Sequence, residues 1–110
     1  MSRRDTERLG DIRAAIASIR GYAEAGEFDS KTVDAVLYNL VVIGEAANQL
    51  SNETTQAAPG IPWTRIVGLR NLIAHEYFRV DREVIGDIVR DQLQELDDVI
   101  ARLLAEAEGT

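Results

Sequence analysis

Residues 30–50 read SKTVDAVLYNLVVIGEAANQL, and the architecture of the chain can be worked out from their pattern. Apolar side chains recur every three or four residues from Val33 to Ala47, which is the period of one face of an α-helix. Asp29 or Ser30 can cap the start of this helix. The opposite side carries a second, partly apolar strip made of Tyr38, Val41, Val42, Glu45 and Gln49. The pattern therefore predicts a helix that is covered on two sides.

The segments on either side of this helix differ in character. Apolar residues from Leu9 to Ala23 repeat the helical period and predict a first helix over about residues 5–25. The sequence Gly26-Glu27-Phe28-Asp29 is expected to interrupt it before the next helix begins. Residues 51–62 are rich in Asn, Thr, Gln, Pro and Gly, so they are predicted to form a loop that can hold one helical turn.

The second half of the chain is also helical by its pattern. A third helix is expected from Trp63 to about His75, and a fourth, capped by Asp81, from there to about Glu106. β-branched residues never alternate with polar ones for long, which argues against a sheet. We therefore expect an all-α, up-and-down bundle of four helices, to which a short fifth helix can be added.

The composition fits a single domain over residues 1–110 and excludes several classes of protein. Cysteine is absent, so disulfides and thiolate nucleophiles are excluded. One histidine and no carboxylates at ligand spacing argue against a metal site, and we expect no cofactor. The longest apolar run is far shorter than the ~20 residues that cross a membrane, and residues 1–7 do not have the pattern expected of a secretory signal. A cytoplasmic protein is therefore expected.

Charge is unevenly distributed along the chain, whose formal net charge is -7. Residues 63–82 carry four arginines against two carboxylates and form the basic segment, whereas residues 83–110 are strongly acidic. The pair Asp97-Asp98 in that acidic helix is predicted to belong to a solvated face. An acidic body repels polyanions, which excludes a general nucleic-acid coat protein.

The third helix carries the residues best suited to chemistry. Most of its surface is apolar on a helical wheel, so most of it is expected to be buried. The exception is a polar stripe made of Thr64, Gly68, Asn71 and His75. Arg70 falls among apolar residues, where a buried charge requires an anionic partner. Glu45 of the second helix is predicted to pair with Arg70 or orient it, the alternative being an exposed helical glutamate.

The segment around Arg70 resembles a known signature. Residues 68–77 read GLRNLIAHEY and contain Arg-x4-His-x-Tyr, which is similar to the motif of the HEPN superfamily, specifically the HepT-like toxin family. Gly44-Glu45-Ala46, Pro62-Trp63 and Tyr77-Phe78-Arg79-Val80-Asp81 also resemble that family. Because these segments occur in the same order, the resemblance covers most of the chain.

The resemblance implies an up-and-down helical bundle that forms a homodimer, with two copies of the motif facing each other across a cleft. Members act as metal-independent endoribonucleases and are commonly encoded beside a minimal nucleotidyltransferase antitoxin, which in some systems modifies the motif tyrosine with AMP. By position, Arg70 and His75 would be catalytic, Asn71 the polar residue that often follows the arginine, and Tyr77 the AMPylation site. Glu45, from the partly apolar strip of the second helix, is expected to support Arg70.

These residue types suit the cleavage of RNA. The ribose 2′-OH is the nucleophile, so the enzyme needs only to take its proton, stabilise the charged phosphorane and protonate the leaving 5′-oxygen. An imidazole suits proton transfer near neutral pH, and a guanidinium suits a phosphate with developing charge. A second His75 from a symmetric dimer would let base and acid come from different copies, giving a 2′,3′-cyclic phosphate.

A second function is compatible with the same residues. The net charge of -7 opposes RNA affinity, which normally comes from phosphate neutralisation. The alternative is a non-catalytic module whose Arg/His/Tyr cleft binds a nucleotide or docks a nucleotidyltransferase. Structural roles also remain open: a helix cap for His75, an interhelical ion pair for Arg70, and packing for Tyr77. Trp63 and Phe78 are expected to pack into the fold. The turn at residues 75–77 determines whether the three motif side chains converge.

Overall fold

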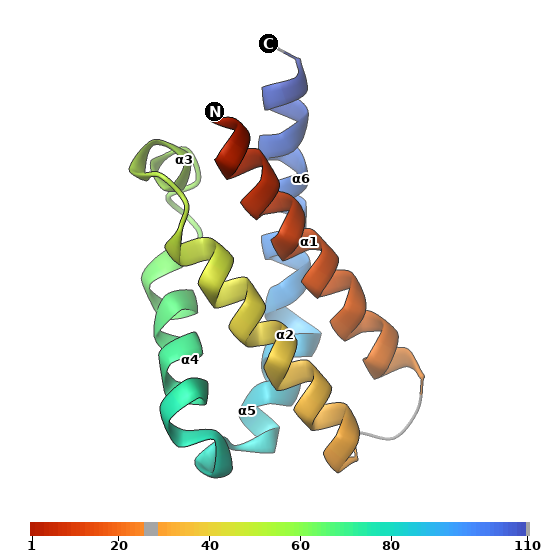
Figure 1. Cartoon of the computed structure of the whole chain (residues 1–110). Coiled ribbons are helices and arrows are strands. Elements are labelled where there is room, and N and C mark those ends of the chain that lie inside the picture. The colour runs from red at the N-terminus through yellow and green to blue at the C-terminus, as the bar shows by residue number, and fades with distance from the viewer. Residues whose placement is uncertain (26–28, 110) are drawn as a thin grey trace.

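The computed structural model describes residues 1–25 and 29–109, and this part of the chain is helical without strands. Its long arms alternate in direction, so both termini lie at the same end of the bundle (Figure 1). In chain order the helices are α1 (Arg3–Glu24), α2 (Ser30–Asn48), the short α3 (Asn52–Gln56), α4 (Trp63–Glu76), α5 (Arg82–Asp87) and α6 (Leu93–Glu108). The predicted all-α, up-and-down bundle is confirmed; α3 is the short additional helix, and the fourth predicted helix is divided into α5 and α6.

The predicted helix boundaries agree with the structure to within a few residues, and the caps explain them. Asp29 caps α2 by accepting a hydrogen bond from the Thr32 N–H, and Asp81 caps α5 by accepting one from the Glu83 N–H. The expected interruption at Gly26-Glu27-Phe28 lies outside the described residues. No described helix is both long enough and apolar enough to span a membrane.

Helix α2 lies at the centre of the bundle, because it packs against α1 on one side and α4 on the other. Its predicted core stripe is buried from Val33 to Ala47. The side chains with almost no exposed surface come from five helices, and they are Leu9, Ile12, Ile16, Ile19, Val36, Ile73, Ile85, Ile100 and Leu103. The core is therefore shared along the whole length of α1, α2 and α6.

The predicted solvated face at Asp97-Asp98 is only half correct. Asp97 lies between two arginines of α1: Arg13 Nε is 3.0 Å and Arg20 Nη1 3.3 Å from its carboxylate oxygens. Asp98 is exposed and accepts a hydrogen bond from Gln94 on its own helix. The apolar stripes bring α1 and α6 together, and this places the Asp97 carboxylate between the arginines.

The predicted fourth helix is not continuous. A π-helical turn over Ile88–Gln92 separates α5 from α6, and the Leu93 N–H donates to the Ile88 carbonyl. Buried Ile85 and Leu93 are eight residues apart, so a regular α-helix would turn them about 80° away from each other. The extra residue of the π turn removes most of that offset, which allows both side chains to face the core.

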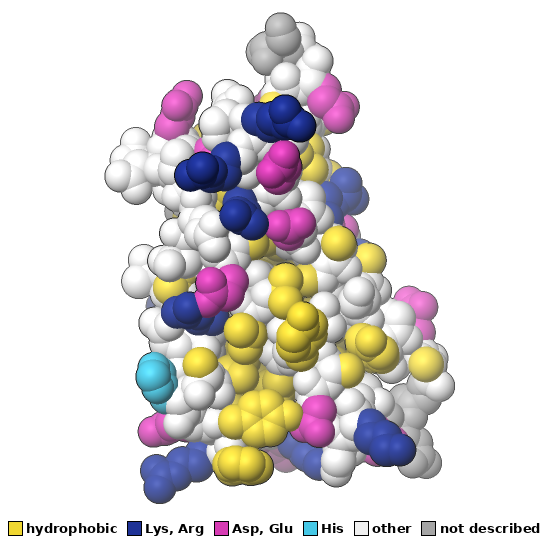
Figure 2. All heavy atoms as spheres, viewed as in Figure 1, with side chains coloured by type: hydrophobic (Ala, Val, Ile, Leu, Met, Phe, Trp, Pro, Cys, Tyr) yellow, Lys and Arg dark blue, Asp and Glu magenta, His cyan; other side chains and the backbone are white. Residues whose placement is uncertain are grey.

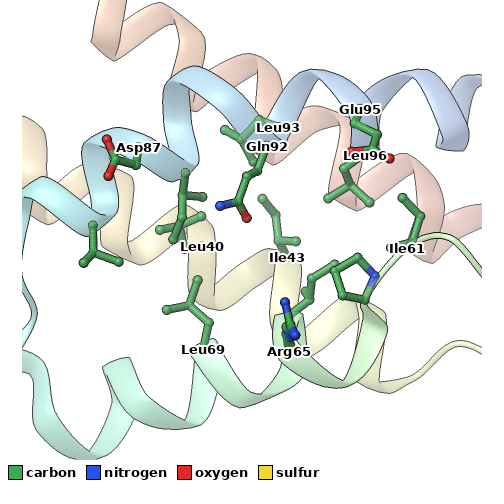
Figure 3. Close-up of a pocket in the computed structure, with 14 residues that line it drawn as sticks. Leu40, Ile43, Ile61, Arg65, Leu69, Asp87, Gln92, Leu93, Glu95 and Leu96 are labelled. Carbon is green, nitrogen blue, oxygen red and sulfur yellow. The ribbon is translucent and has the colours of Figure 1, made fainter.

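The prediction that most of α4 is buried is wrong. Ile73 is the one buried residue among those described in α4, and Leu72 is 47% exposed. The reason is that α4 packs closely on α2 alone. A cavity of about 540 Å³ separates its other apolar flank from α6, with Leu69 on one wall, Leu93 and Leu96 on the other, and Leu40 of α2 between them (Figure 3).

A buried carboxylate ties α1 to α3. Asp5 is only 3% exposed and accepts hydrogen bonds from the Ser51 N–H at 3.1 Å and the Thr54 hydroxyl at 2.6 Å, besides one from the Ser51 hydroxyl. Burial alone would raise the pKa of Asp5, but these hydrogen bonds together outweigh it and hold the pKa below its ordinary value. The ionised carboxylate thereby fixes the loop that leads into α4.

Gly44 determines how closely α4 approaches α2. A Cβ atom at Gly44 would lie 2.2 Å from Arg70 Cβ and 3.2 Å from the Ile66 carbonyl oxygen, both on α4. The distance to Arg70 Cβ is far shorter than a van der Waals contact and the distance to the carbonyl oxygen is tight, so a larger residue must push the two helices apart. A glycine at this position therefore lets the backbone of α2 lie directly against Arg70.

We expect Gly44→Ala to destabilise the protein by about 1–3 kcal/mol, because the added methyl overpacks the contact with α4. The measurement is the urea midpoint of unfolding. Gly10→Ala is the matched control: Gly10 lies within α1, a Cβ there meets nothing within 4 Å, and the change should stabilise the helix by about 0.5–1 kcal/mol. Equal midpoints for the two variants would contradict the close contact.

Candidate functional site

The end of α4 and the turn after it carry the motif residues. Arg70, Asn71 and His75 lie on the last two turns of α4, and Tyr77 begins a short 3-10 helix over Tyr77–Arg79. Between them, Glu76 has φ -132° and ψ 40°, which is not helical backbone. This residue ends the regular rotation of α4, so Tyr77 does not continue the helical phase of Arg70 and His75.

Arg70 is held by two polar side chains. Its Nη2 donates to Glu45 Oε1 on α2, and its Nη1 donates to Asn71 Oδ1 at 2.6 Å. The predicted ion pair between Glu45 and Arg70 is therefore present, and both side chains keep substantial solvent exposure, 43% and 30%. The ion pair orients the guanidinium. It also leaves the guanidinium accessible to a ligand, because within the described residues these contacts use two of its five N–H donors and the other three remain.

His75 lies at the surface, one helical turn beyond Asn71 on the same face of α4. The sole histidine of the chain appears in cyan at the edge of the molecule in Figure 2. Arg70 and His75 are five residues apart, so their side chains leave the helix about 140° from each other. Asn71 connects the two directions, since it accepts from Arg70 and shares the face of His75.

Tyr77 forms a hydrogen bond with Asp34, a residue that the sequence analysis did not identify as part of the site. Its hydroxyl donates to Asp34 Oδ1 on α2, and this hydrogen bond raises the pKa of the Tyr77 phenol. Asp34 and Glu45 are eleven residues apart, which places them on one face of α2 but about 16 Å apart along its axis. Tyr77 and Arg70 therefore bind α2 at two separate positions. Within one copy, the Tyr77 hydroxyl and the Arg70 guanidinium do not converge on a common site.

The spacing along α2 could have identified Asp34. Eleven residues are close to three full turns of an α-helix, so Asp34 shares the face of the predicted strip that contains Tyr38, Val41 and Glu45. The carboxylates of Asp34 and Glu45 thus lie near opposite ends of one helix face, where each can bind a separate polar partner. The sequence does not reveal, however, that the turn after α4 brings Tyr77 back to α2.

The predicted strip on α2 forms part of an apolar surface. Tyr38 is 69% exposed, Val41 and Val42 are half-buried, and apolar side chains gather over α2 on this side of the molecule (Figure 2). Phe78 is 98% exposed, so the prediction that it packs into the fold is wrong. Its ring meets the ring of Tyr77 edge to face, with the centroids 5.5 Å apart, and both aromatics stay accessible.

This arrangement offers an anchored cation, which can bind a phosphate, and an exposed imidazole, which can move a proton, on the same helix. The cavity of Figure 3 lies on the opposite flank of α4 and is lined by Arg65, Ile66 and Leu69 rather than by motif residues. Across residues 1–25 and 29–109, no three His, Asp or Glu side chains gather as metal ligands would.

Comparison with known proteins identifies similar sequences. Residues 8–103 match the model of a family described as Ribonuclease HepT-like. "Probable ribonuclease HepT" of Thermococcus cleftensis is 33% identical over 101 residues, which are 87% of this chain and 92% of the relative. No solved structure gives a significant match.

Two relatives from Methanocaldococcus jannaschii are similar over shorter regions. "Putative RNase MJ1380" is 36% identical over 62 residues, which are 56% of this chain and 57% of the relative. "Putative RNase MJ0127" is 34% identical over 86 residues, which are 74% of this chain and 71% of the relative. The aligned region thus spans little more than half of the first of these proteins.

Proposed function

Because this chain belongs to the HepT-like ribonuclease family, we propose that it is a metal-independent endoribonuclease and the toxin of a toxin–antitoxin pair. The observation that carries the proposal is the Arg70 guanidinium, which Glu45 and Asn71 hold beside the face of α4 that presents His75. An oriented, accessible cation on the same helix as an exposed imidazole supplies the two groups that phosphodiester cleavage needs.

The proposed reaction uses the RNA as its own nucleophile. His75 takes the proton of the 2′-OH, the 2′-oxygen forms a bond to phosphorus, and the bond from phosphorus to the 5′-oxygen breaks. Arg70 donates hydrogen bonds to the phosphoryl oxygens as their charge develops. A second imidazole protonates the leaving 5′-oxygen, and the products are a 2′,3′-cyclic phosphate and a free 5′-hydroxyl.

Replacing either Arg70 or His75 with Ala is expected to lower the rate of RNA cleavage at least ~10²–10³-fold, the usual cost of removing one transition-state group. Both side chains are partly exposed, so the variants should still fold. The assay follows cleavage of RNA by the purified protein in the presence of a chelator.

The matched controls for this assay lie on the same helix. Arg65→Ala removes an exposed arginine from the other flank of α4, and Leu72→Ala shortens an apolar side chain of α4 that is 47% exposed. Both should cleave RNA within a few-fold of the wild-type rate. Cleavage that requires a divalent metal, or a fully active His75→Ala protein, would contradict the mechanism.

The second imidazole is proposed to come from a second copy of the chain. Arg70 and His75 point about 140° apart within one α4, and the exposed apolar strip of α2 with Tyr38 lies on the face that a second copy would cover. A symmetric dimer buries the strip and places two α4 helices near each other. The dimer therefore accounts for both the exposed strip and the incomplete site.

Light scattering at micromolar concentration is expected to give the mass of a dimer. Tyr38→Glu places a charge in the strip without touching the core, because Tyr38 is 69% exposed, and it should shift the protein toward monomer and lower RNA cleavage together. Tyr22→Glu changes a tyrosine of α1 that is 44% exposed and lies outside the strip, so it serves as the control. A monomeric wild-type protein that cleaves RNA would refute the composite site.

Tyr77 is proposed to be the point of control by a cognate nucleotidyltransferase antitoxin. Its oxygen would attack the α-phosphorus of ATP, forming a phenyl ester of AMP and releasing pyrophosphate. The hydroxyl proton would pass to Asp34, whose carboxylate already accepts a hydrogen bond from Tyr77. Phe78, 98% exposed beside Tyr77, gives a partner an accessible aromatic contact.

Co-expression with the nucleotidyltransferase is expected to raise the intact mass by one or more AMP units. The added charge should weaken RNA binding. The shift should disappear in Tyr77→Phe and persist in Tyr22→Phe, which alters another partly exposed tyrosine. A shift that persists in Tyr77→Phe would place the modification on another residue.

A further inference from the structure

A second hollow adjoins the site on the side of Asn71. It lies between the end of α2, α3 and the first half of α4, and its volume is about 440 Å³. We call this hollow the amide groove, and six of its lining residues are Asn48, Asn52, Thr55, Trp63, Gly68 and Asn71. The groove therefore follows the polar stripe of α4 away from His75.

The amide groove carries no charged side chain among the described residues that line it; the remaining lining residues are Ala47, Leu50, Thr64 and Val67. This is notable in a chain in which 28% of the residues are charged. A phosphate or a charged peptide finds no counter-ion there. The groove instead suits a flat, neutral ligand that offers hydrogen-bond donors and acceptors.

Three asparagines supply the polar groups of the groove. Within the described part of the chain, no side-chain hydrogen bond engages the amides of Asn48 or Asn52. Asn71 uses its oxygen to accept from Arg70 and keeps its NH₂ group for a ligand. An asparagine amide can donate and accept at once, which matches the N6 and N7 edge of adenine in a bidentate pair.

Trp63 contributes a rigid aromatic surface to the groove. Its Nε1 donates to the carbonyl oxygens of Thr55 at 3.2 Å and Ala58 at 3.1 Å, so the position of the indole is fixed. The side chain is only half-buried. Unpaired RNA bases stack on such aromatic side chains while their edges are read by hydrogen bonds.

We propose that the amide groove is a nucleobase subsite that takes an unpaired adenine next to the phosphate at Arg70. This inference rests on the proposed ribonuclease function and names the substrate feature that the site selects. Asn71 joins the two parts, because its oxygen accepts from Arg70 Nη1 at 2.6 Å while its side chain lines the groove. Gly68 in the groove and His75 are seven residues apart, so the groove and the imidazole are separated by about 10 Å along α4.

Gly68 provides a substitution that fills the groove without disturbing the fold. A Cβ at Gly68 would meet nothing within 4 Å, because this part of α4 faces the open groove. Gly68→Leu should therefore fold and occupy the space of the base. Gly10→Leu is the matched control, since Gly10 also lies within a helix and its Cβ would also meet nothing within 4 Å.

The test uses the fluorescence of Trp63, the single tryptophan of the chain. Adenosine, cytidine, guanosine and uridine monophosphates are titrated into the wild-type protein, Gly68→Leu, Gly10→Leu and Asn52→Ala. Adenosine monophosphate should bind the wild-type protein and Gly10→Leu about 10-fold or more tightly than uridine monophosphate, the usual discrimination of a bidentate amide contact. Gly68→Leu should lose this binding, and Asn52→Ala should lose the preference.

The outcomes separate this inference from the proposed function, because RNA cleavage is measured on the same proteins. Adenosine binding that Gly68→Leu abolishes supports the subsite even if the wild-type protein cleaves no RNA. Equal binding of all four nucleotides, or wild-type binding by Gly68→Leu, overturns it even if RNA is cleaved. Loss of nucleotidyltransferase binding in Gly68→Leu with unchanged nucleotide binding would also overturn it, since the groove would then be a protein contact.

Discussion

The close approach of α2 and α4 at Gly44 is the constraint on which the site depends. The backbone of α2 lies against the stem of Arg70, and the next residue along α2, Glu45, then meets the guanidinium. A half-exposed ion pair of this kind contributes only about 0–1 kcal/mol to stability. Its consequence is geometric: the glycine sets the helix separation, and the glutamate fixes the direction in which Arg70 presents its remaining donors.

The same helix holds the other polar end of the motif. Asp34 lies on the face of α2 that carries Glu45, about 16 Å away along the axis, and it accepts the hydroxyl of Tyr77. Within one copy, a group attached to Tyr77 would therefore not sit directly on Arg70. It would instead crowd the apolar surface between the two carboxylates, so in the proposed dimer such a group would inhibit by blocking assembly or entry to the cleft between the two copies.

Much of this organisation follows from the sequence, and the errors have identifiable causes. The periodicity of apolar residues predicts the helices. The charge of Arg70 among apolar residues predicts an anionic partner, and Glu45 in the partly apolar strip of α2 is that partner. Both inferences need only the pattern along one helix. The burial of α4 could not be predicted because it depends on whether α6 packs against this helix. The π turn over residues 88–92 could not be predicted because it depends on the core that Ile85 and Leu93 share. Both features are set by contacts between distant parts of the chain. The contact between Tyr77 and Asp34 depends on one non-helical residue, Glu76.

The electrostatics of the site bear on what kind of RNA it can select. The net charge is -7, and Glu45 offsets the charge of Arg70, so phosphate attraction contributes little to affinity and weakens further with salt. Arg70 can still bind a phosphate, because Glu45 and Asn71 engage only two of its five N–H donors in the described structure. With weak attraction to the backbone, discrimination must come from neutral contacts to bases and from shape. A ribonuclease that uses the proposed site would therefore spare bulk RNA and act on strands whose unpaired bases fit beside Arg70.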